Sequence, residues 1–134
     1  MKTGIDISEK LYEILNVSTV TSVIDGDIYR DSKPTDSELQ DIVLLSLTTE
    51  GDEDVQNGLF VINIYCKNLQ YGMPNETKLR EIANAVLIVL DAYVQTGTNY
   101  FDISIINENT MQDVNQAIMS YTSIRINCMI QRDP

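Results

Sequence analysis

The run SYTSIRINCMIQR near the C-terminus restricts the fold more than any other part of the sequence, because core-like residues occupy every second position. A period of two is typical of a β-strand that covers a core with one face only. The positions predicted to face the core are Ile124, Ile126, Cys128 and Ile130. The positions predicted to face away are Tyr121, Arg125, Asn127 and Met129. The chain is therefore expected to contain a sheet with two unlike faces.

Two earlier runs, DIVLLSLTT and GLFVINIYCK, predict a β-hairpin in the middle of the chain. The second run alternates strictly, whereas the first is apolar on both faces, as in a strand that is covered on both sides. Their connection, residues 50–57, exceeds the two to five residues usual in hairpins, so we expect it to project beyond the sheet. DIYR and YFDISII predict shorter strands, STVTSV is β-rich, and residues 107–118 are expected to form a second long loop.

The strongest helical pattern is NETKLREIANAVLIVLDAYVQTG, with Asn75 or Thr77 as N-cap and Gly97 beyond the end. Its predicted core stripe is Leu79, Ile82, Ala83, Val86 and Leu90. A shorter helix is predicted in DISEKLYEILN, with Asp6 or Ser8 as N-cap. We therefore expect a single α+β domain, residues 1–134, with a small, mostly antiparallel sheet packed by the long helix and a short N-terminal helix.

The charge balance restricts the class of partner. Twenty acidic and nine basic residues give a net charge of −11, which repels nucleic-acid phosphates and anionic lipid headgroups. The most apolar run, AVLIVLDAYV, is too short to span a bilayer and contains Asp91. We expect a soluble, cytoplasmic protein with no membrane association and no specific binding of nucleic acid.

Residue types that carry catalysis are sparse. Histidine is absent, and the sequence contains no phosphate-binding, dinucleotide-binding, C-x-x-C or nucleophile-elbow motif. Cys66 and Cys128 lie in strand-like runs and are expected to be buried thiols. The sequence thus predicts no catalytic residue, no cofactor and no metal site.

An acidic cluster, TTEGDEDVQNG, lies between the two hairpin strands and contains Glu50, Asp52, Glu53 and Asp54. Its spacing does not match a calcium loop, and four exposed acids are all expected to stay ionised rather than act as an acid–base pair. We interpret the cluster as an interaction loop that contacts a neighbouring subunit or another protein, or that lines a channel.

The sheet face opposite the core stripe is expected to be partly apolar. The residues predicted to lie on it are Ile42, Leu44, Val61, Tyr65, Tyr121 and Met129. Such a surface is larger than a monomer usually leaves in water. It is covered either by the first helix or the loop containing Pro34, or by another subunit.

The order of elements, with GDIYR followed by Pro34 and the VINIYCK strand before the long helix, resembles the tail completion and tail terminator proteins of long-tailed phages. The resemblance extends over nearly the whole chain. It implies a non-enzymatic structural protein of a phage or prophage, found in the host cytoplasm and then in the virion tail. The chain departs from the family pattern in its acidity and in the crowding of acids on the hairpin.

The resemblance further implies self-assembly into a ring, commonly a hexamer, that caps the tail tube and joins it to head-connector proteins. The alternative is a small ferredoxin-like α+β domain that acts as a homodimer in regulation or ligand binding.

Overall fold

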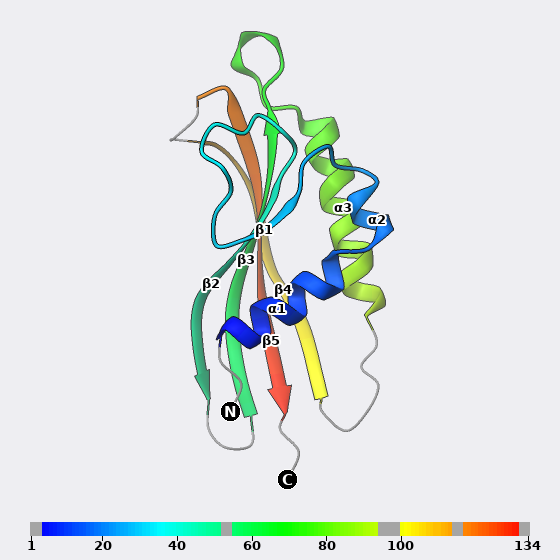
Figure 1. The fold of residues 1–134 in the computed structure, drawn as a ribbon, viewed down its shortest axis with the longest axis vertical. Coiled ribbons are helices and arrows are strands. Elements are labelled where there is room, and N and C mark those ends of the chain that lie inside the picture. Colours follow the sequence, from blue (N-terminus) through cyan, green and yellow to red (C-terminus); the bar gives the residue numbers. More distant parts are fainter. Residues whose placement is uncertain (1–3, 52–54, 94–99, 114–116, 132–134) are drawn as a thin grey trace.

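The computed structural model describes residues 4–51, 55–93, 100–113 and 117–131. They form a strongly twisted sheet with helices beside it (Figure 1). In chain order the elements are α1 (Gly4–Leu15), α2 (Ser18–Thr21), β1 (Ile28–Arg30), β2 (Ile42–Gly51), β3 (Val55–Lys67), the 3-10 turn η1 (Gln70–Gly72), α3 (Glu76–Ala92), β4 (Tyr100–Gln112) and β5 (Met119–Gln131).

The five strands lie in the order β1-β2-β3-β5-β4. β1 runs parallel to β2, and every other neighbouring pair is antiparallel. The predicted fold class, a small and mostly antiparallel α+β sheet with a long helix and a short N-terminal one, is therefore confirmed. The hairpin of β2 and β3 and the strand at DIYR are also confirmed.

The core lies between one face of the sheet and the helices α1 and α3. The predicted stripe of β5 supplies Ile124, Ile126 and Cys128, all fully buried, opposite Ile62 and Phe60 of β3. All five predicted core residues of α3 are buried. Asn75 caps α3 as predicted, since its side chain accepts a hydrogen bond from the Lys78 amide at 3.2 Å. Gly97 lies outside the described residues.

Two expectations for the N-terminal segment are wrong. α1 begins at Gly4, so Asp6 and Ser8 lie inside the helix instead of capping it. The buried Ser8 hydroxyl accepts a hydrogen bond from Arg30 Nε at 3.3 Å. The β-rich run forms the short helix α2, because Val20 is fully buried in the shared core and this packing outweighs local β-propensity.

The expected second long loop is largely strand. β4 continues to Gln112 and pairs with β5 along its length, with a register shift between Ile105 and Asn107 that marks a β-bulge. Because the strand lies at the sheet edge, its polar side chains reach water while its backbone pairs with β5. The hydroxyls of Thr110 and Thr122 add a cross-strand contact at 2.9 Å.

The hairpin connection is shorter than expected. Glu50 pairs with Asn57 and Gly51 with Gln56, so the ladder continues and leaves residues 52–54 between the strands. The predicted connection over residues 50–57 is therefore wrong. The hairpin end of β2 and β3 nevertheless extends past α1 at one end of the molecule (Figure 1).

A buried carboxylate organises the turn before β1. Asp41 is fully buried and accepts hydrogen bonds from the Asp27 amide at 3.0 Å and from Ser37 Oγ at 2.6 Å. Gly26 lies directly against it: an added Cβ would contact Asp41 Oδ1 and lie 2.7 Å from the Gln40 carbonyl oxygen. The sequence IDGDIYR therefore serves the packing of this turn, since Gly26 leaves room for the buried Asp41 carboxylate.

Candidate interaction surface

The outer sheet face, meaning the face turned away from α1 and α3, carries a pair of tyrosines. Tyr65 of β3 lies opposite Tyr121 of β5, with ring centroids 5.2 Å apart and ring planes tilted by 34°. Both side chains are half-buried. Met129 lies on the same face of β5 and is also half-buried, as the alternation predicts.

The assignment of Ile42 and Leu44 to this outer face is wrong. Ile42 pairs with Ile64 and Leu44 with Ile62, so they share the core face, and both are essentially fully buried. Cross-strand partners point to the same side of a sheet. β2 is apolar on both faces, and its register against β3 could not be derived from alternation.

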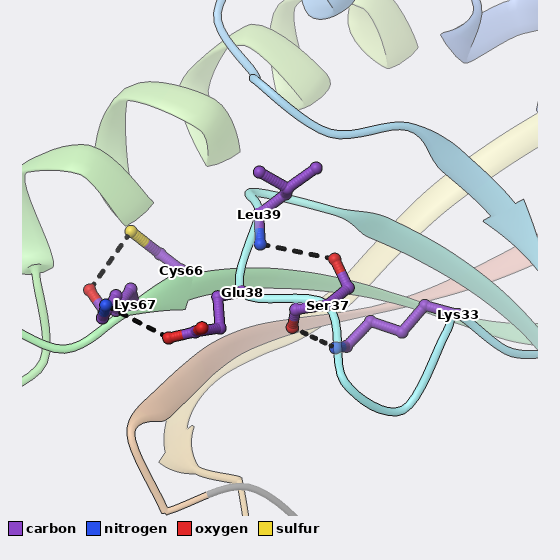
Figure 2. Close-up of polar contacts among 6 residues, drawn as sticks. All are labelled: Lys33, Ser37, Glu38, Leu39, Cys66 and Lys67. Atoms are coloured by element: carbon purple, nitrogen blue, oxygen red, sulfur yellow. Dashed lines mark hydrogen bonds and ion pairs between the residues drawn. The ribbon is translucent and has the colours of Figure 1, made fainter.

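The loop of residues 31–41, which contains Pro34, covers part of the outer face, as one of the coverings considered from the sequence predicts. Lys33 Nζ lies 4.9 Å from the centroid of the Tyr65 ring and donates a hydrogen bond to the Ser37 carbonyl at 3.2 Å. Glu38 of the same loop pairs with Lys67 of β3 at 3.1 Å (Figure 2). The first helix instead lies on the core side, where Leu11 is buried.

Asn63, which the sequence analysis did not single out, is the unusual polar group of the outer face. It lies in β3 between the positions of Val61 and Tyr65, is 7% exposed, and its Oδ1 has no hydrogen-bond partner among the described residues. An unsatisfied buried carbonyl oxygen lowers the stability of the fold. The sequence signal for this residue was the side-chain amide of Asn63 within the otherwise apolar run VINIYCK. Val61 itself is 6% exposed.

The Tyr65 hydroxyl is held in its neutral form. Burial raises the pKa of the Tyr65 phenol most, the negative charge of Asp113 and the nearby Tyr121 raise it further, and a hydrogen bond from Asn63 lowers it. A neutral phenol can both donate and accept. The outer face therefore offers hydrogen bonds beside an aromatic pair.

The acidic cluster is only partly described. Glu50 lies in β2, and Asp52, Glu53 and Asp54 lie outside the described residues. Among the side chains that are described, no group of three or more Cys, Asp or Glu could hold a metal ion. Cys66 and Cys128 are buried free thiols, as predicted. No described helix is both long and apolar enough to cross a membrane.

The geometry defines a class: an α+β domain whose mixed sheet is covered by helices on one face and by a loop on part of the other. A solved structure of this fold is a chain of the "Virion of native gene transfer agent (GTA) particle". The two chains share 12% identity and a TM-score of 0.66, over 94% of this chain and 95% of that one. No protein-family model matches the sequence, and comparison with curated protein sequences gives no significant match.

Proposed function

We propose that the chain is a non-enzymatic structural protein of a phage-like particle, a tail terminator or tail completion protein. In this proposal it is made in the host cytoplasm and is then part of the virion tail. The observation that carries the proposal is the end-to-end similarity of fold to a chain of a gene transfer agent virion. The proposed assembly is a hexameric ring between tail-tube and head-connector proteins.

The outer sheet face supports a role in assembly. Val61, Tyr65, Tyr121 and Met129 are the proposed contacts, and the unsatisfied Asn63 Oδ1 lies among them. Closure of a ring would bury the half-exposed aromatic pair. The acidic hairpin end, which extends past α1, is proposed to contact a partner or to line the channel through which DNA passes.

The ferredoxin-like alternative receives less support. That fold follows the order β-α-β-β-α-β, whereas the described elements run as two helices, three strands, a helix and two strands. No observation favours it over the proposed ring protein.

Light scattering coupled to size exclusion tests the ring, both for the isolated chain and with tail-tube protein added. Met129→Glu should give a folded chain that does not associate, because a charge buried in an interface without a partner is expensive to desolvate. Ser46→Glu is the matched control, since Ser46 is exposed on β2. Normal assembly of Met129→Glu would place the interface elsewhere, and a chain monomeric under both conditions would contradict the proposed function.

A further inference from the structure

The tip loop, residues 69–73, lies at the end of the molecule opposite the hairpin end of β2 and β3 (Figure 1), and its apolar side chains are exposed. Leu69 is 54% exposed, Met73 63% and Tyr71 91%. The surrounding stretch NLQYGMPN contains no charged residue, in a chain with a net charge of −11. Large exposed apolar side chains that lie together usually mark a contact with another molecule.

The tip loop is held in a defined conformation. At its base, Asn68 donates its amide to the Ile118 carbonyl at 2.7 Å, and its side chain accepts a hydrogen bond from Ser120 Oγ at 2.5 Å. Within the loop, the Leu69 amide donates to the Met73 carbonyl at 2.7 Å. These bonds present the apolar side chains on a preorganised scaffold, which reduces the entropy lost on binding.

Tyr71 has a backbone conformation that a bulky residue rarely adopts. Its φ is 68°, in the left-handed region, which disfavours side chains with a Cβ. The ring is almost wholly exposed, so it gains little from packing within its own chain. Strained backbone of this kind is concentrated at functional positions.

A groove between α1 and α3 offers a site for an apolar segment such as the tip loop. It has a volume of about 390 Å³ and is open to solvent. Its walls include the exposed Val17 and Ile88, and its two charged residues, Lys10 and Glu13, balance each other. Lys10 Nζ lies 5.6 Å from the Tyr93 ring centroid, so the groove already holds one aromatic ring beside a cation.

The tip loop and the groove lie at opposite ends of α3. The loop precedes the N-cap Asn75, whereas the groove contains Ile88 and Tyr93 near the C-terminal end. At 1.5 Å per residue, the twelve residues from Glu76 to Ile88 span roughly 18 Å of helix. The loop of one chain is therefore remote from its own groove.

We propose that the tip loop of one copy inserts into the α1–α3 groove of the next copy, a head-to-tail contact that rests on the proposed ring function. Two unlike surfaces on one chain generate a ring when the rotation closes. Charge favours a second copy as the occupant: most surfaces of a chain at −11 repel each other, whereas the uncharged loop and the balanced groove do not. The outer face, on the other side of the sheet, remains a second part of the proposed contact between subunits.

Disulfide trapping tests this contact. Tyr71→Cys and Ile88→Cys in one chain should give, on oxidation with copper phenanthroline in air, a ladder of covalent oligomers on denaturing gels. Two equimolar single variants, mixed, should give a covalent dimer, and each alone should give none. Cys66 and Cys128 do not interfere, because both are buried and burial raises the pKa of the Cys66 thiol. The matched control pairs Tyr71→Cys with Leu39→Cys, an exposed aliphatic position on the loop of residues 31–41, and should give no ladder.

Light scattering of the same samples before oxidation separates the possible failures. If a ring forms but no cross-link joins Tyr71→Cys to Ile88→Cys, the proposed contact is overturned and the proposed ring function still stands. A disulfide between two copies of the Tyr71→Cys variant alone, or only between that thiol and a cysteine of added tail-tube protein, overturns the head-to-tail contact in favour of a different occupant. A chain that stays monomeric with and without tail-tube protein overturns both proposals.

Discussion

Replacement of Gly26 by alanine tests whether the buried Asp41 carboxylate organises the turn before β1. The new methyl group would contact Asp41 Oδ1 and lie 2.7 Å from the Gln40 carbonyl oxygen and 2.9 Å from Asp41 Cγ. Overpacking of this kind costs about 1–3 kcal/mol, and loss of the Asp27 amide bond to the carboxylate adds about 1.5–3 kcal/mol. Reduced entropy of the unfolded chain offsets about 0.4–1 kcal/mol. The expected loss of unfolding free energy is therefore about 3 kcal/mol.

For a chain of 134 residues this loss lowers the melting temperature by roughly 10–15 °C in thermal unfolding followed by circular dichroism. Gly72→Ala is the matched control: its φ is +74°, but an added Cβ meets nothing within 4 Å, so only backbone strain of about 1–2 kcal/mol is expected. In an Asp41→Ala background the effect of Gly26→Ala should shrink, because the carboxylate is gone. The reasoning is refuted if the melting temperature of Gly26→Ala equals that of the wild type. It is also refuted if Gly72→Ala has a lower melting temperature than Gly26→Ala.

Three further outcomes are expected. Ile126→Ala and Leu90→Ala should each lower the unfolding free energy by about 2–5 kcal/mol in urea titrations, and unchanged midpoints would mean that these faces are misassigned. The pKa of Tyr65 is raised in the folded state, so its contribution is present below the unfolded value of 10.0 and is lost as pH rises through the folded one. Stability should therefore fall as pH rises above about 10, and fall less in Tyr65→Phe. Neutralising the four acids of the hairpin with Gln or Asn should leave the melting temperature unchanged. It should also reduce the salt dependence of association with tail-tube protein, measured from low salt up to 0.1 M, where charges are screened over about 10 Å. Tight binding of calcium or magnesium by the wild type would contradict that interpretation.

The sequence predicted those elements whose side chains differ between faces. The stripe through Ile124 and Ile126 identified β5, and the 3.6-residue period with its Asn75 cap identified α3, because burial on one side leaves a period in the sequence. The outward position of Tyr121 followed from the same alternation. Asn63 was visible as an interruption in an apolar run, but its missing partner depends on the surrounding structure.

Other features depend on contacts between distant segments. Ile42 and Leu44 could have faced either way, and only their register against β3 places them in the core. The second half of β4 is polar, and its strand conformation comes from backbone pairing with β5. The tip loop and the groove belong to separate parts of the sequence, residues 69–73 on one side and the facing sides of α1 and α3 on the other.

The bulge in β4 has a consequence for colloidal behaviour. Among the described strands, β4 is an edge strand of 13 residues, and long edges can recruit strands from other chains into amyloid-like ribbons. The register shift between Ile105 and Asn107 divides this edge into two shorter segments that a single straight strand cannot follow together. Glu108 is exposed on the second segment, so an identical edge would meet a like charge there. The bulge thereby biases a concentrated pool of free subunits against fibrillation.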